Sequence, residues 1–139
     1  MDKHITLQQL ADTCNEISIA DNLSLATEII HGEMDVLQIL IESREEFPVY
    51  VTIDDNQILC VSYLWQEQEI IAATRDELLD TLLTLNLPMP LSSFSKVGNQ
   101  YIVFGALNIH SAVADVVFEI EALSQNTLDA LDLLTDYLK

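Results

Sequence analysis

The segment Leu85-Asn86-Leu87-Pro88-Met89-Pro90-Leu91-Ser92-Ser93-Phe94 decides the fold, because it separates a helical pattern before it from a hairpin pattern after it. Each proline fixes φ at about −65° and favours an extended residue before it, so a helix cannot continue through the segment. We therefore expect a stiff crossover from helix to sheet. An alternative stays open for Leu87, Met89 and Leu91, whose apolar side chains would also suit an exposed and adaptable surface.

The patterns on either side of this segment predict a helix, a hairpin and a last helix. Leucines at positions 78, 79, 82, 83 and 85 recur at helical spacing, and Thr74 and Glu77 have the spacing of a capping box. Gly98-Asn99 predicts a two-residue turn between strands at 92–97 and 100–107. Ser111 is placed to cap a last helix that begins at about Ala112, with residues 124–127 as a candidate interruption.

The first half of the chain predicts a helix followed by a strand meander. Thr6 and Gln9 have capping-box spacing before a helix at about 7–17. Residues 23–42 predict two strands joined at 31–33, and residues 49–53 and 58–65 predict a hairpin. We expect a single α+β domain over residues 1–139, with three helices and an antiparallel sheet of five to six strands in the order α-ββββ-α-ββ-α. Residues 36–41 and 58–65 carry apolar groups on both faces, so both faces of the sheet need to be covered. The helices would cover one face, and a homodimer would cover the other.

The chain is strongly acidic but rich in apolar residues. Its 139 residues include 23 Asp and Glu against five Lys and Arg, a formal charge of −18, while 50% are hydrophobic. Because the acids are dispersed among patterned apolar positions, the composition indicates a folded domain with an acidic surface and not a disordered acidic tail. Nucleic acids and anionic lipids are bound mainly through Lys and Arg, so the charge disfavours both and favours a basic protein partner.

Other features indicate the compartment and the class of activity. Residues 1–6 lack the pattern of a secretory signal, and the apolar runs are shorter than the roughly 20 residues that span a membrane, so we expect no direct membrane insertion. Cys14 and Cys60 form no metal-type pair and predict reduced core thiols of a cytoplasmic protein. The chain shows no nucleophile, phosphate-loop or metal motif, so we assign no catalytic residue, cofactor or metal ligand and predict a protein that is not an enzyme.

Two groups of side chains are candidates for binding a partner. Tyr50, Tyr63 and Trp65 predict an aromatic surface on the meander hairpin, although they would also fit beneath a helix. The last helix carries an acidic stripe within about 60° of arc, for which a solvated face is favoured over a basic-partner or divalent-metal face. Its members are Asp129, Asp132 and Asp136.

Three segments together resemble the YjfI-like family of small bacterial proteins: VTIDDNQILC at 51–60, LNLPMPLSSF at 85–94 and NTLDAL at 126–131. The family has no established activity, so the resemblance implies no site residues. Its members tend to be encoded near a PspA-like protein, a helical membrane-stress factor, which implies a connection with envelope stress and makes a PspA-like protein one candidate partner. The order of elements is also similar to that of type III secretion chaperones and YbjN-like proteins, which implies a curved sheet with helices on one face and another surface free for a partner.

These observations favour a non-enzymatic, cytoplasmic adaptor or chaperone-like protein that binds a protein partner through an apolar patch rimmed by acid. The alternative is a small-molecule or metal-sensing regulatory domain with a pocket between the sheet and the helices.

Overall fold

The computed structural model describes residues 4–139, and residues 1–3, on which the predicted absence of a secretory signal partly depends, lie outside the described residues. Within this range the fold is α+β, as predicted, and the chain forms three α-helices and one seven-stranded sheet. The elements are α1 (Leu7–Glu16), β1 (Ser18–Ile19), β2 (Leu23–Ile30), β3 (Val36–Ile41), β4 (Val49–Ile53), β5 (Ile58–Gln66), α2 (Arg75–Leu85), β6 (Ser93–Val97), β7 (Gln100–Leu107) and α3 (Val113–Leu133), with short 3-10 turns at Ala20–Asn22, Glu67–Glu69, Ala72–Thr74 and Thr135–Tyr137.

The strands lie in the order β1-β2-β3-β4-β5-β7-β6, and all neighbours are antiparallel. The predicted order of elements is confirmed, and the strand count exceeds the prediction by one. The additional strand, β1, is only two residues long and pairs Ser18 with Ser24 and Ile19 with Leu23. Such a short strand carries too little periodicity to be recognised in a sequence.

Of the three predicted helix caps, the one at α1 is present and those at α2 and α3 are absent. The capping box of α1 is present, since the Gln9 amide donates to the Thr6 hydroxyl at 3.1 Å and the Thr6 amide donates to Gln9 Oε1 at 2.9 Å. The predicted box at Thr74 is absent, because the Thr74 hydroxyl donates to the Ile71 carbonyl instead. Ser111 does not cap α3, whose N-cap is Ala112.

The predicted interruption of α3 at residues 124–127 is also wrong. The helix is continuous from Val113 to Leu133, and the Thr127 hydroxyl donates to the Leu123 carbonyl one turn earlier, at 2.8 Å. This bond satisfies the hydroxyl inside the helix, so Thr127 has no need to begin a new one.

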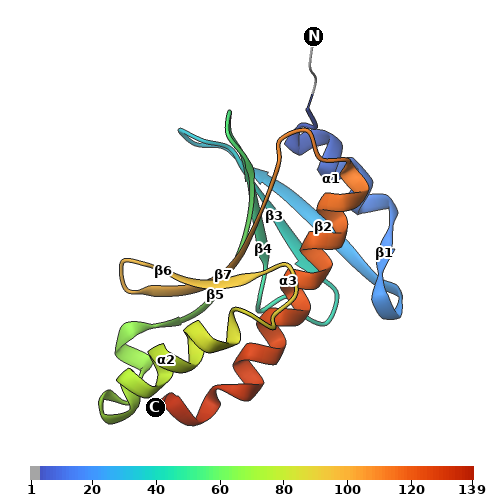
Figure 1. The fold of residues 1–139 in the computed structure, drawn as a ribbon. Coiled ribbons are helices and arrows are strands. Elements are labelled where there is room, and N and C mark those ends of the chain that lie inside the picture. The colour runs from blue at the N-terminus through green and yellow to red at the C-terminus, as the bar shows by residue number, and fades with distance from the viewer. Residues whose placement is uncertain (1–3) are drawn as a thin grey trace.

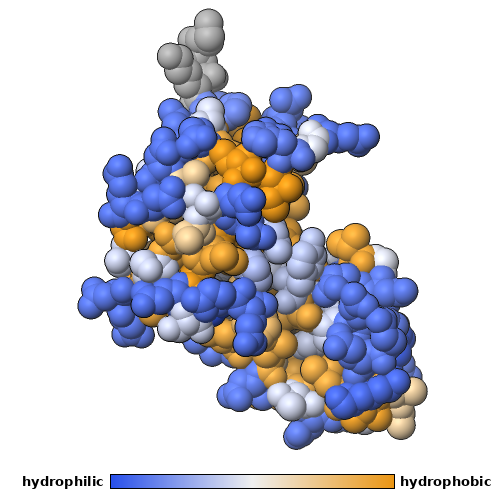
Figure 2. All heavy atoms as spheres, turned by 180° about the vertical axis from the view of Figure 1, so that it is seen from behind, coloured by the Kyte–Doolittle hydropathy of each residue, from blue (hydrophilic) through white to orange (hydrophobic). Residues whose placement is uncertain are grey.

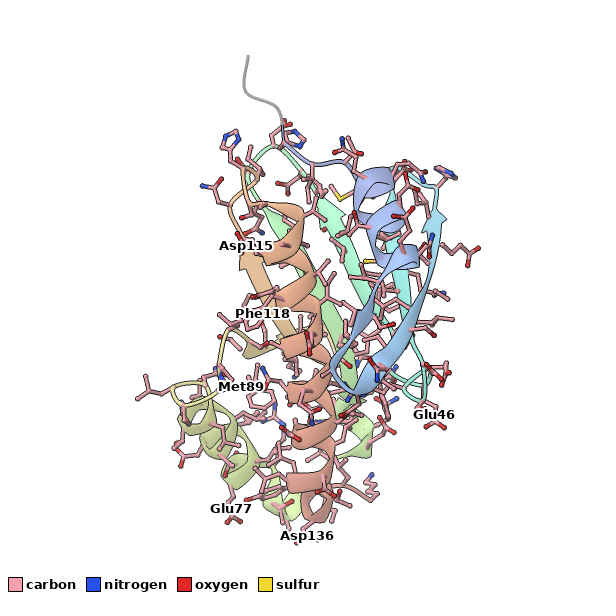
Figure 3. The ribbon with its side chains drawn as sticks, turned by 90° about the vertical axis from the view of Figure 1, so that its right-hand side faces the viewer. Glu46, Glu77, Met89, Asp115, Phe118 and Asp136 are labelled. Atoms are coloured by element: carbon pink, nitrogen blue, oxygen red, sulfur yellow. The ribbon has the colours of Figure 1, made fainter. Side chains whose placement is uncertain are left out.

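Helices α1 and α3 lie side by side over one face of the curved sheet (Figures 1 and 3). The main core lies between them and the strands, and it contains Leu10 and Cys14 of α1 together with Ile120 and Leu123 of α3, all of them fully buried. Cys60 of β5 belongs to the same core. Burial of these side chains is the main stabilising term of this half of the molecule.

A second hydrophobic cluster lies where α2 meets the C-terminal end of α3, beyond the lower end of the sheet in Figure 1. Leu78 and Leu82 of α2 are buried there against Trp65, Tyr101 and Leu134. The two clusters share partly buried contacts, so they form a continuous apolar interior; the shared residues are Leu64 and Phe94.

Candidate functional site

Within residues 4–139, no helix covers the face of the sheet opposite α1 and α3. Cross-strand pairing aligns Gln38 with Tyr50, Tyr50 with Val61, and Val61 with Phe104, so these side chains lie in one row on that face. Alternation along the strands adds the positions two residues away. We call the resulting surface the open sheet face; it consists of Val36, Gln38 and Leu40 of β3, Tyr50 and Thr52 of β4, Leu59, Val61 and Tyr63 of β5, and Ile102 and Phe104 of β7.

The ten residues of the open sheet face are uncharged in a protein whose formal charge is −18, and the exposed Glu28 of β2, which pairs with Gln38, borders them on the same side of the sheet. None of its ten residues belongs to either core cluster; most are half-buried, Tyr63 is exposed and Ile102 is buried. A sheet face that meets only water normally alternates polar residues outward. An extended apolar surface of this kind is typical of an interaction site.

The centre of this face is hollowed. The hollow has a volume of about 530 Å³ and is lined mainly by apolar side chains together with Tyr50, Thr52 and Gln100. Tyr50 and Tyr63 stand beside each other in it, with ring centroids 5.4 Å apart, and Tyr63 is 51% exposed. Figure 2 shows several apolar patches over the middle of the molecule from behind, with hydrophilic residues between and around them.

Trp65, the third predicted aromatic residue, is not part of the open sheet face. The pairing between β5 and β7 shifts between Tyr63 and Gln66, so β5 has one extra residue at that point. This bulge turns the Trp65 side chain toward the helical side, where it is 3% exposed and its ring lies 5.9 Å from that of Tyr101. For Trp65 the alternative of packing beneath a helix therefore holds, whereas strict alternation, which would place it on the face of Tyr63, fails at this bulge.

The proline segment is both a crossover and a surface. Met89 is half-buried against the main core, as the crossover prediction requires, whereas Leu87 is 93% exposed. Met89 also lines a groove of about 220 Å³ together with Asp129 of α3, so the structure brings these two candidate residues together. Asp132 is exposed on the same helix and Asp136 is exposed in the turn after it.

A charged cluster at the end of β5 was not anticipated. Glu67 accepts hydrogen bonds from Arg75 at 2.9 Å, Lys96 at 2.7 Å and the Tyr101 hydroxyl at 3.0 Å. Hydrogen bonds from Arg75 and then Lys96 lower the pKa of Glu67 to about 2. Two of the five basic residues of the chain are therefore used to hold this corner together.

The thiols and imidazoles form no reactive arrangement in the described residues. Burial raises the pKa of the Cys14 thiol to about 11 and that of the Cys60 thiol to about 12, so both are protonated at neutral pH and poor nucleophiles. Both cysteines are free and buried. No group of three or more His, Cys, Asp or Glu side chains in residues 4–139 is arranged to hold a metal ion.

Glu119 is an unexpected acidic residue inside the molecule. It is 5% exposed and lies over Gly105 of β7, whose strand neighbour is Cys60. A Cβ atom at position 105 would lie 2.0 Å from Glu119 Oε1, so a glycine is required there. Burial raises the pKa of the Glu119 carboxyl. The isolated glycine within an otherwise apolar strand was the only sequence signal of this close approach.

No helix within residues 4–139 is both long enough and apolar enough to cross a membrane. The sequence is similar to the uncharacterized protein YjfI of Escherichia coli strain K12, with 27% identity over 132 residues that cover 90% of this chain and 98% of YjfI. YjfI of Escherichia coli O157:H7 matches with the same figures. The predicted resemblance to YjfI-like proteins is thus confirmed.

The fold is similar to the crystal structure of YbjN from E. coli, described as "a putative transcription regulator", with a TM-score of 0.62 and 13% identity over 92% of this chain and 94% of YbjN. The predicted YbjN-like topology is confirmed, and at this identity the likeness concerns the fold alone. The family described as "Uncharacterized protein conserved in bacteria (DUF2170)" matches residues 4–138. Because that match spans nearly the whole chain, the protein belongs to the DUF2170 family.

Proposed function

We propose that this protein is a non-enzymatic adaptor or chaperone-like protein that binds a partner protein through the open sheet face. The observation that carries the proposal is the uncharged, hollowed sheet face on a molecule of charge −18. The exposed Tyr63 ring beside Tyr50 offers an aromatic anchor at its centre. The proposal places the protein in the cytoplasm, which is supported by the two free, buried cysteines of the described residues.

The partner that fits best has an apolar centre and a basic rim. A second copy of this chain would cover the face sterically but would bring another charge of −18 against the first. Three of the basic side chains are also engaged within the chain: Arg75 and Lys96 bind Glu67, and Arg44 donates to Ser124 and Gln125. A partner rich in Lys or Arg would be attracted by the acidic surface of this protein, whereas a second copy would be repelled by it. Nucleic acid is disfavoured by the same charge.

The family resemblance supplies one candidate, a PspA-like protein. Its binding can be measured with both purified proteins by titration calorimetry. We expect Tyr63→Glu to weaken binding at least tenfold, because it places a charge in the centre of the apolar contact. The control is Leu83→Glu, which also adds one negative charge at an exposed apolar position but lies on α2. Equal weakening by both variants would contradict a role of the open sheet face.

A second candidate function, a small-molecule-sensing domain, is favoured by one observation. The hollow volume of about 530 Å³ lies within the roughly 300–1,000 Å³ of small-molecule pockets. A thermal-shift screen against common metabolites and divalent metals separates the two functions, since a ligand at about 100 times its Kd stabilises the fold by about 2.7 kcal/mol. A hit that Tyr63→Glu abolishes would support the sensing function, and sedimentation of the protein alone would identify a second copy as the occupant.

A further inference from the structure

The groove beside the proline segment lies on the helical side of the sheet, away from the open sheet face. It runs between the loop after α2 and the C-terminal half of α3, and Pro88, Met89, Pro90, Asp129 and Leu133 contribute to its walls. We call it the proline groove. We propose that it is a second docking site, which takes a peptide segment of a partner protein that carries one large apolar side chain next to a lysine or arginine.

The wall formed by the loop is held in place before any partner binds. Asn126 of α3 donates to the Pro90 carbonyl at 2.8 Å and to the Ser92 hydroxyl at 3.0 Å. On the other side of the loop, Asn86 accepts the Phe94 amide hydrogen. With both ends tied and two prolines between them, little conformational freedom is left to lose on binding.

The same loop exposes apolar side chains at a cost to the fold. Leu91 has φ +65° and is 54% exposed, although bulky residues are rarely found in the left-handed region. A glycine would adopt this conformation without strain. Leu91 stands beside the groove and does not line it, whereas Leu133 of α3 lines it and is 64% exposed. The groove therefore has an apolar wall that is open to a partner.

The chemistry of the groove selects its occupant. Its volume of about 220 Å³ lies below the roughly 300–1,000 Å³ of small-molecule pockets and suits a single large side chain. Asp129 lines the groove and Asp132 follows it on an exposed turn of α3, so a cation beside the apolar anchor would be attracted. Arg44, Arg75 and Lys96 are all engaged elsewhere and leave Lys139 as the remaining basic side chain of residues 4–139, so a second copy offers few cations for this role.

This inference goes beyond the proposed function, because it gives the protein a second binding surface on its other side. Two separated surfaces would allow it to join two proteins, or two segments of one protein. The two sites can be tested separately, since the variants that affect them lie on different elements.

The experiment is selection of peptides from a displayed library of random 16-residue segments on the immobilised full-length protein, followed by affinity measurement with the selected synthetic peptides. We expect enriched peptides to carry a large apolar residue within one helical turn of Lys or Arg. Asp129→Lys and Leu133→Asp should each weaken their binding at least tenfold. Glu77→Lys is the matched control for Asp129→Lys, because Figure 3 places Glu77 at the far end of α2 from Met89.

Several outcomes would overturn the inference. Selection of no peptide would do so, as would selection of peptides that lack the apolar and basic pair. Peptides that bind Asp129→Lys and Leu133→Asp as tightly as the native protein but lose affinity for Tyr63→Glu would refute the proline groove while supporting the open sheet face. If Glu77→Lys lowered peptide affinity as strongly as Asp129→Lys, the peptides would be responding only to the net charge of the protein.

Discussion

The rings of Tyr50 and Tyr63 lie with their centroids 5.4 Å apart and their planes tilted by 44° on neighbouring strands of the open sheet face. Tyr50 pairs directly with Val61, so Tyr63 is its diagonal neighbour on the same face. Both rings lie among uncharged residues, and Tyr63 is 51% exposed. This pair is the structural centre of the proposed binding function.

The tyrosine pair should contribute only modestly to folding. We expect Tyr50→Ala and Tyr63→Ala to show a coupling energy of about 0.5–1.5 kcal/mol in a double-mutant cycle, the usual range for such pairs. Urea denaturation of the four proteins measures it. A coupling of several kcal/mol would instead indicate that the pair is retained for stability, which would weaken the argument for binding.

Gly105 should be intolerant of even one added methyl group. Gly105→Ala would force its Cβ into the Glu119 carboxylate, and we expect a loss of about 1–3 kcal/mol in the free energy of unfolding. Gly32→Ala is the control, because its Cβ would meet only the Met34 carbonyl at an ordinary 3.6 Å. The loss at position 105 should shrink in a Glu119→Ala background, and an equal loss there would show that the carboxylate is not the obstacle.

Glu67 should make the protein lose stability in acid. Hydrogen bonds from Arg75 and Lys96 lower its pKa from 4.5 to about 2 in the folded state, so the folded protein binds fewer protons than the unfolded chain. Its stabilising contribution is therefore complete above pH of about 4.5 and is lost as the pH falls toward 2. Stability measured by urea denaturation should fall over this window, and Glu67→Gln should flatten that part of the curve. An unchanged curve in the variant would assign the acid sensitivity to other groups.

Glu119 should act in the opposite direction. Burial raises its pKa in the folded state, so its contribution is present at low pH and lost as the pH rises through the folded pKa. We expect Glu119→Gln to be relatively more stable than the native protein at neutral pH than at acidic pH. A difference that does not change with pH would show that Glu119 titrates alike in the folded and unfolded states.

The two exposed leucines of the proline segment offer a direct test of backbone strain. Leu91→Gly removes the cost of a left-handed leucine, about 1–2 kcal/mol, and this gain should outweigh the added entropy of the unfolded chain. Leu87→Gly removes a side chain that also lies outside both hydrophobic clusters but is not at positive φ, so it should be neutral or destabilising. Thermal denaturation should place Leu91→Gly above Leu87→Gly, and the reverse order would show that Leu91 is unstrained.

The order of helices and strands could be predicted from the sequence, because each helix or strand depends on local periodicity and on the turn residues beside it. The prolines end α2 as expected, and Gly98 supplies the positive φ of 58° that its hairpin turn needs. Both apolar sides of β3 and β5 were also visible in the sequence. The alternation of side chains along a strand does not show which face of the sheet the helices cover, because that depends on where α1 and α3 pack against the sheet.

The remaining errors arise from tertiary contacts that override local rules. One extra residue in β5 moved Trp65 from the open sheet face into the second hydrophobic cluster. The hydroxyl of Thr127 bonds back within α3 and allows the helix to continue. Neither effect leaves a distinct mark in a single sequence. The proline groove depends likewise on Asn126, which reaches the loop from a residue 36 positions away in the chain.

The open sheet face as a protein-binding surface is tested most directly by site-specific photocrosslinking in living cells. A photoreactive phenylalanine analogue is placed at Tyr63, with the same analogue at Leu83 on α2 as the control, and the partner in each adduct is identified by mass spectrometry. We predict an adduct between position 63 and one different, basic protein, absent from position 83 and lost when Val61→Asp is added. No adduct at position 63, an adduct with a second copy of this chain, or identical adducts at both positions would contradict the account.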